Sequence, residues 1–189
     1  MASILKVDTI QDQSGNNIIN ENAGTITIGK SGDTVNLASG ATAGFGKVAQ
    51  VITASTSTEV SNTTSTYADT GLTATITPSS TSSKILVLTN QSVLMTEPGN
   101  LGGCAVRLLR DATVIAGGDQ RFEFFIQALG SGSTNLSMYG RININILDNP
   151  STTSAITYKT QGARYLSGNE IQTQPDSIES RIILMEILG

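Results

Sequence analysis

Carboxylates are the side chains of this sequence best suited to acid–base chemistry. The 189 residues include 15 Asp and Glu but no His, and the only cysteine is Cys104. Histidine-based nucleophilic triads and zinc sites that need imidazole or paired thiolates are therefore excluded. Two carboxylates about 5 to 10 Å apart can hydrolyse a glycosidic bond, and the pairs in question are Asp111 with Asp119 and Asp176 with Glu179. We interpret most of these as solvated turn residues, so no catalytic residue, metal site or cofactor is predicted.

Aromatic rings and hydrogen-bonding groups on rigid loops offer a second chemistry, because rings stack on sugar faces or fill protein pockets. Such groups lie in or beside predicted strands: Tyr139, Tyr158, Arg164 and Tyr165. Loops rich in Gly, Ser and Asn accompany them at residues 130–135 and 162–169. We predict that Tyr139, Arg164 and Tyr165 contact a receptor. The alternative is that each side chain packs in a core or interface with its polar end in water.

β-strands must position these side chains, since no segment shows a 3.6-residue period. Residues 53–83 contain 19 Ser or Thr among 31, yet residues 72–77 alternate cleanly, and Thr suits a pleated strand. Short strands are predicted at regular intervals: residues 72–77, 84–89, 105–110, 113–116, 122–128, 136–147, 155–165 and 180–188. This spacing is typical of an all-β, antiparallel β-sandwich, and we predict a jelly-roll-like head over residues 48–189.

Three features of the predicted strands concern packing. Residues 141–146 form the clearest strand, with every isoleucine on one side. Residues 182–188 are apolar on both faces apart from Glu186. Such a strand needs cover on both faces, either from a neighbouring subunit or from a central place in a monomeric sandwich. Cys104, between two glycines and Ala105, is interpreted as a small core residue.

A nine-residue repeat precedes the sandwich. The repeated aliphatic positions form two rows: Ile10, Ile19, Ile28 and Leu37, with Ile26 and Val35 two residues ahead of the last two. Burying one of these aliphatic side chains stabilises the fold by about 1.5 to 3 kcal/mol. Ordering the backbone of every residue costs about 1 to 2 kcal/mol in conformational entropy, so a single chain does not gain enough from the few side chains that it can bury. We therefore predict that residues 1–40 form an intertwined β-repeat stem, in which identical chains bury these six side chains on a shared axis. A meander packed on the following domain is the alternative.

Composition sets further bounds. Residues 41–47 are rich in Gly and Ala, and we interpret them as a linker. The net charge is −4 and only 14% of residues are charged, which indicates no nucleic-acid partner. No run approaches the ~20 apolar residues of a membrane span, and residues 1–6 lack the pattern of a secretory leader. Assembly in a cytoplasm, without membrane insertion, is expected.

Several segments resemble the fibre proteins of marine tailed bacteriophages. The N-terminal likeness rests on residues 2–11, 24–29 and 31–37, and the likeness to the β-sandwich head of those fibres rests on residues 67–72, 80–87, 147–150, 158–159 and 183–187. The N-terminal part is the more specific one, because Thr- and Ser-rich sandwiches occur in many settings. The chain lacks the long shaft of large tail fibres, so the resemblance indicates a short, knob-like appendage.

The resemblance implies a homotrimeric structural protein of the virion that is not an enzyme. Its partners would be two further copies of itself, other virion proteins and a glycan or protein of the host surface. Ile4, Leu5 and Val7 form an alternating cluster too small to fold alone, and we predict that they dock the fibre to the particle. Two alternatives stay open: a capsid decoration or head fibre without a receptor role, and a spike enzyme that degrades polysaccharide.

Overall fold

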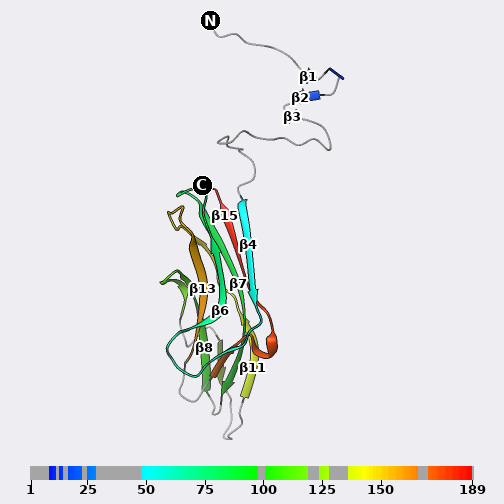
Figure 1. Ribbon diagram of the computed structural model, residues 1–189. Coiled ribbons are helices and arrows are strands. Elements are labelled where there is room, and N and C mark those ends of the chain that lie inside the picture. Colours follow the sequence, from blue (N-terminus) through cyan, green and yellow to red (C-terminus); the bar gives the residue numbers. More distant parts are fainter. Residues whose placement is uncertain are drawn as a thin grey trace. The chain divides into compact units, whose positions relative to one another are not determined.

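The computed structural model describes residues 9–11, 13–14, 17–22, 25–28, 48–97, 101–118, 124–127, 136–165 and 170–188. The chain divides into two compact units, Met1–Phe45 and Gly46–Gly189 (Figure 1). The described residues contain no α-helix, and none of their segments is a helix long and apolar enough to cross a membrane.

The first unit contains an antiparallel meander of three short strands: β1 (Thr9–Gln11), β2 (Asn17–Asn22) and β3 (Thr25–Ile28). Its register places Ile19 opposite both Ile10 and Ile28, so the nine-residue spacing becomes one line across the strands. Ile10 and Ile28 are 42% and 54% exposed. The nine-residue step is therefore one strand with its turn. Intertwining of several chains stays a prediction.

For the other residues predicted to lie on the axis or to dock the fibre, the structure gives only the register of Ile26. Ile26 lies opposite Glu21 in the meander. Five remaining positions fall outside the described residues: Ile4, Leu5, Val7, Val35 and Leu37.

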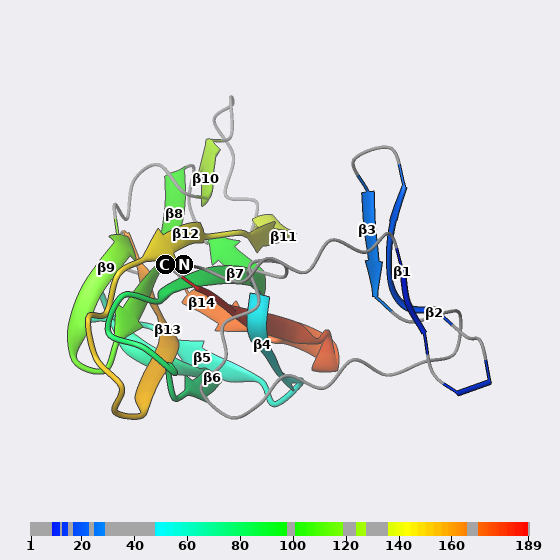
Figure 2. The same cartoon turned by 90° about the horizontal axis from the view of Figure 1, so that it is seen from above.

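The second unit consists of two antiparallel sheets packed face to face (Figures 1 and 2). Seven strands share four positions across the first sheet, because short strands run end to end at three of them. In order, the positions hold β4 (Val48–Thr56) with β5 (Val60–Asn62), β15 (Ser180–Ile187) with β14 (Glu170–Thr173), β7 (Lys84–Glu97), and β12 (Asn145–Asp148) with β11 (Leu136–Ile142).

Five strands share the four positions of the second sheet. In order, they are β6 (Ala68–Ile76), β13 (Ile156–Arg164), β8 (Leu101–Arg110), and β9 (Thr113–Gly117) with β10 (Phe124–Gln127). Along the chain, successive positions alternate between the two sheets except at the β8–β9 hairpin. This connectivity is that of a jelly roll. The predicted all-β sandwich is therefore confirmed.

The jelly roll has two distinct ends. Val48, where β4 begins, lies opposite Ile187 at the end of β15, and Ile187 in turn lies opposite Lys84 at the start of β7. We call this the proximal end; the β6–β7, β8–β9 and β12–β13 connections also lie here. At the opposite, distal end, β7 ends and β8 begins, β10 ends and β11 begins, and β13 ends and β14 begins.

Side chains that alternate inward from both sheets form one core. Fully buried members include Leu72, Ile85, Leu108, Tyr158 and Leu184, one from each of five strands. On β6, Leu72, Ala74 and Ile76 face inward and Thr73 and Thr75 face outward, while Thr70 is a polar residue that also faces inward. Cys104 is fully buried within the same core, as the sequence predicts.

The strand predicted over residues 136–147 is interrupted, since β11 ends at Ile142 and β12 begins at Asn145. Thr89 of β7 lies at the break. Its hydroxyl accepts the N–H of Ile144 at 2.9 Å and donates to the Ile144 carbonyl at 3.1 Å. A side-chain hydroxyl thus replaces a backbone carbonyl in the ladder. The predicted faces are confirmed, because residues 142 and 144 are buried and residues 141, 143 and 145 are exposed.

Candidate functional site

An excursion of the chain between β14 and β15 interrupts the strand pairing along one edge of β7. Both strands pair with the same edge of β7, Thr173 opposite Val93 and Arg181 opposite Asn90. Between these pairs, β7 has two residues, 91 and 92, whereas the opposing chain has seven, 174–180. The surplus residues leave the sheet and form the 3-10 turn η1 (Pro175–Ser177).

Backbone conformations in this excursion are unusual. Gln174, Asp176 and Ser177 have φ values of 55°, 51° and 62°, and the described residues contain only two other non-glycine residues with positive φ. Such conformations cost about 1 to 3 kcal/mol each unless surrounding contacts impose them. Their concentration in one surface segment marks it as a candidate for function.

Buried hydrogen bonds hold the inner side of the excursion. Ser180 Oγ accepts from the backbone N–H of Ser92 and from Nε2 of Gln91, both at 2.9 Å. Gln91 Oε1 accepts from Thr160 Oγ1 at 2.9 Å, and Thr160 Oγ1 lies 2.6 Å from Thr70 Oγ1. Thr70 and Thr160 belong to the second sheet, so the network joins the two sheets beneath η1. A fully satisfied polar network rigidifies the segment above it.

A groove of about 240 Å³ lies on the outer face beside η1. Its lining residues are Ser92, Val93, Tyr139, Gly140, Arg141, Pro175 and Ile178. Tyr139 lies on the edge strand β11 and is 53% exposed, and Ile178 is 37% exposed. The groove therefore offers an aromatic ring and an aliphatic side chain to solvent beside fixed polar groups.

A hydrogen bond to a carboxylate holds the Tyr139 hydroxyl in place. This hydroxyl donates to Asp176 Oδ2 at 2.6 Å, and the backbone N–H of Asp176 donates to Glu59 Oε2 at 3.3 Å. The hydrogen bond to Asp176 raises the pKa of Tyr139, and the nearby negative charges act in the same direction. On the same strand, the Arg141 guanidinium donates to Asn90 Oδ1 and, at 3.0 Å, to the Glu179 carbonyl. The groove thus carries both signs of charge around one ring.

The predicted carboxylate pair Asp176 and Glu179 belongs to this excursion, where both carboxyl groups have partners within the protein. Glu179 forms a 2.6 Å ion pair with Arg181, which lowers the pKa of its carboxyl. A general acid needs a raised pKa. Asp111 accepts the backbone N–H of Thr157 at 2.9 Å, as a turn residue does. Asp119 lies outside the described residues.

The structure separates Tyr139 from the other predicted receptor residues. Arg164 ends β13 and Tyr165 follows it at the distal end, where both are half-buried and the Tyr165 N–H donates to Gly103 O at 2.7 Å. Residues 162–164 belong to β13, in agreement with the strand predicted over residues 155–165, so this part of the predicted recognition segment 162–169 is strand and not loop. The loop at 130–135 lies outside the described residues. Tyr158 is fully buried and its hydroxyl donates to Asp148 Oδ2 at 2.6 Å, so it is a core residue.

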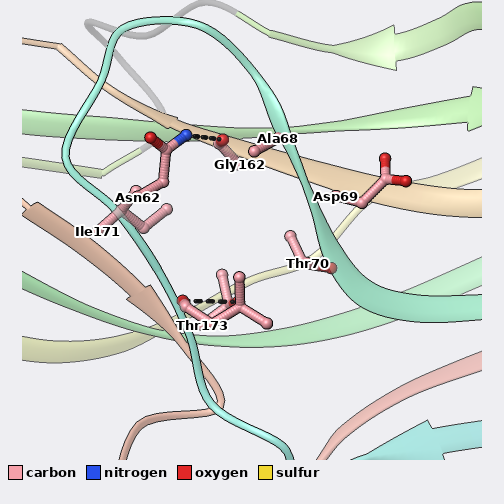
Figure 3. A pocket seen from close by; sticks show the side chains of 8 residues that line it. Asn62, Ala68, Asp69, Thr70, Gly162, Ile171 and Thr173 are labelled. Carbon is pink, nitrogen blue, oxygen red and sulfur yellow. Dashed lines mark hydrogen bonds between the residues drawn. The ribbon is translucent and has the colours of Figure 1, made fainter.

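A second hollow lies between β5, β6, β13 and β14, with Asn62, Asp69, Thr70 and Thr173 among its lining residues (Figure 3). Its volume of about 10 Å³ suits one water molecule rather than a ligand. Asn62 Nδ2 donates to Gly162 O at 2.9 Å and to Thr66 O at 2.8 Å. This asparagine therefore closes the β5–β6 connection, and the hollow is structural.

Sequence reasoning missed the excursion that shapes the groove. Arg141 was predicted only as a strand residue, and Pro175 and Ile178 were not singled out. The signal available was Pro175 followed by Asp176 and Ser177, a turn-forming run just before the last apolar strand.

No protein-family model and no curated protein matches the sequence. The chain is similar to solved structures of infectious bursal disease virus. For the Gx strain, identity is 14% and the TM-score 0.34, over 83% of this chain and 36% of that chain. For the VP2 subviral particle, the corresponding values are 13%, 0.33, 83% and 42%. The chain spans about two fifths of the length of these structures, and at such TM-scores the likeness carries no argument about function.

Proposed function

We propose that the chain is a homotrimeric structural protein of a virion, a short phage fibre that docks by its N-terminal segment and attaches to a host surface through its jelly-roll head. The sequence resemblance to marine phage fibres supports this function. Jelly rolls are also found in viral capsid proteins and lectins, so the fold is compatible with this function but does not by itself specify it.

The separation of the two ends of the jelly roll is the observation that best supports the proposal. The chain from the N-terminal unit reaches the sandwich at Val48, at the proximal end. Both segments predicted to contact a receptor adjoin strands that begin or end at the opposite end, β11 with Tyr139 and β13 with Arg164. The connection to the N-terminal unit and the strands next to the proposed recognition segments thus lie at different ends of the sandwich, and binding residues are commonly carried on loops of such a scaffold.

Exposed isoleucines support the assembly of several chains. In the meander, Ile10 and Ile28 lie on one cross-strand line and are largely exposed in the single chain. Burying these side chains against their counterparts in identical chains removes apolar surface from water. A weak receptor contact repeated on three heads also gains avidity, provided that the receptors are dense enough to be bridged.

Native mass and host adsorption test the proposal together. Light scattering on the full chain should report three times the chain mass, and the purified protein should compete with phage particles for adsorption to host cells. A monomeric mass would end the fibre proposal. A trimer that does not compete for adsorption would instead indicate the decoration role without a receptor.

Deletion of residues 2–10 tests the docking assignment. We expect the truncated protein to keep a folded head but to be missing from particles assembled in its presence. Incorporation at the level of the full chain would assign docking to another part of the protein.

A further inference from the structure

One apolar row crosses all four positions of the first sheet on its outer face. The register aligns Val51 of β4 with Met185 of β15, Met185 with Leu86 of β7, and Leu86 with Leu147 of β12. Val51 and Leu147 are 51% and 54% exposed, while Met185 and Leu86 are half-buried by their neighbours in the sheet. None of the four packs against the core, which receives the alternate residues of each strand.

Further aliphatic side chains widen this row toward both ends of the sheet. Ile183 of β15 lies opposite Leu88 of β7, two residues from Met185 in the direction away from the proximal end. Ile187 lies opposite Val48 of β4, two residues from Met185 toward the proximal end. The row itself contains no charged residue; Glu186, next to Met185 in sequence, is fully buried in the opposite direction. We call these eight residues the apolar face: Val48, Val51, Leu86, Leu88, Leu147, Ile183, Met185 and Ile187.

The outer face of the second sheet shows what a water-facing surface of this protein looks like. Lys159 forms a 2.9 Å ion pair with Asp69, and Gln161 Nε2 donates to the same carboxylate at 2.7 Å. Arg107 donates to Gln161 Oε1 at 2.6 Å, and Thr75 and Thr157 hydroxyls lie 2.8 Å apart. The two outer faces therefore differ in chemistry, although both belong to sheets of equal width. Contiguous exposed apolar surface of this kind marks an interaction site.

We propose that the apolar face is the contact between the heads of neighbouring chains in a three-fold ring, an inference that rests on the trimeric assembly of the proposed function. A second copy is the occupant that the observations favour. None of the eight residues is charged, although Lys84 lies opposite Ile187 at the proximal border of the face. The central row of four residues thus offers a partner apolar contacts alone. Part of the face lies on β4, the first strand after the N-terminal unit. Ile10 and Ile28 of that unit are also exposed apolar residues in the single chain.

The most exposed members of the row define how neighbouring heads meet. Val51 and Leu147 lie on the two outermost positions of the sheet, whereas Met185 and Leu86 lie between them. In a closed ring, each contact joins different patches of two copies. The β4 edge of one head then meets the β12 edge of the next, which places Val51 of one copy near Leu147 of the other.

Paired cysteines on the full chain test this arrangement. Strands lie about 4.8 Å apart, so Val51 and Leu147 of one chain are about 14 Å apart, too far for a disulfide within the chain. Oxidised V51C/L147C should therefore run on a non-reducing gel as covalent dimers and trimers. Cys104 is fully buried and does not compete. The matched control is T73C/V114C, the two ends of the row Thr73, Lys159, Leu109 and Val114 on the second sheet, which should stay monomeric on the gel.

The outcomes separate this inference from the proposed function. A trimeric native mass without cross-linking of V51C/L147C would overturn the apolar face as the contact and leave the trimer standing. A mass of two chains would overturn the ring. A monomeric wild type would overturn both proposals.

A second variant does not depend on disulfide formation. M185K places a charge in the middle of the row on the outer face and should shift dissociation of the trimer to lower denaturant concentration. T75K makes the matched change on the second sheet and should leave dissociation unchanged. Equal dissociation midpoints for the wild type and M185K would contradict the proposal.

Discussion

Ser79 donates both its backbone N–H and its hydroxyl to Oε1 of Glu186, each at 2.6 Å, although Glu186 is fully buried. Gln50 Nε2 donates to the other carboxylate oxygen, also at 2.6 Å. Burial by itself raises the pKa of Glu186, but the hydrogen bonds from Ser79 and Gln50 outweigh it and lower the pKa to about 2. The one acidic residue of β15 therefore joins this strand to β4 and to the β6–β7 turn.

Replacing Glu186 by Gln should destabilise the head at pH 7 by about 1 to 3 kcal/mol, the usual worth of hydrogen bonds to a charged group. Because the folded pKa lies below the ordinary value of 4.5, this stabilisation is fully present above pH 4.5. It is lost as the pH falls toward about 2. Urea unfolding of both proteins across this range checks the prediction: the wild type should lose stability more steeply than E186Q. E179Q, which alters an exposed ion pair, is the control and should change little.

Replacing Thr89 by Val should destabilise the head by about 1 to 3 kcal/mol, because the buried N–H of Ile144 loses its acceptor. Valine keeps the shape of the side chain, so packing is preserved. Thermal unfolding compares T89V with T75V, whose hydroxyl lies on the exposed face. Equal losses in the two variants would show that the Thr89 hydroxyl has no special part in the β11–β12 break.

Replacing Tyr139 by Ala should reduce competition with phage for adsorption, since it removes the exposed ring of the groove. Y139F separates two contributions, because it keeps the ring and loses only the hydrogen bond to Asp176. If stacking dominates, Y139F should compete almost as well as the wild type. Combined replacement of Arg164 and Tyr165 by Ala tests the second region. Normal competition by both the Y139A and the R164A/Y165A proteins would assign recognition to another virion protein.

Replacing Ile28 by Asp should dissociate or aggregate the N-terminal assembly, because three carboxylates would meet near one axis. Ile28 is largely exposed in the single chain, so the change acts on assembly more than on the fold of one chain. Light scattering gives the readout. T27D, at the preceding position of β3, is the control. Successive residues of a strand alternate between its two faces, so this variant should keep the native mass.

Period-two alternation made much of the sandwich predictable. It located the strand that contains residues 72–77, whose apolar face is buried in the core. A near-continuous apolar run located the strand that contains residues 84–89, and the regular spacing of strands located residues 105–110. Strands whose apolar and polar residues do not alternate clearly and that contain no apolar run were not predicted. β5 and β14 are short and mostly polar, and their partners are distant in sequence, Val60 opposite Thr173 for example. Their positions follow from pairing with β7 and with each other, which local pattern does not reveal.

The candidate site was predicted only in part for a related reason. Tyr139 was identified because its residue type suits recognition, and Asp176 because carboxylates suit hydrolysis. Their 2.6 Å hydrogen bond joins positions 37 residues apart. It depends on the surplus of residues opposite Gln91 and Ser92, a register difference that exists only once β14 and β15 have both paired with β7.

The division of the jelly roll into proximal and distal ends bears on how such a protein can change over generations. Substitutions more than about 7 to 10 Å apart that share no partners have nearly additive effects on stability. Tyr165 follows the distal end of β13, whereas Glu186 and its partners lie at the proximal end. New side chains near Tyr165 can therefore be sampled without disturbing the hydrogen bonds around Glu186. Drift at one end of the fold and constraint at the other are compatible within a single jelly roll.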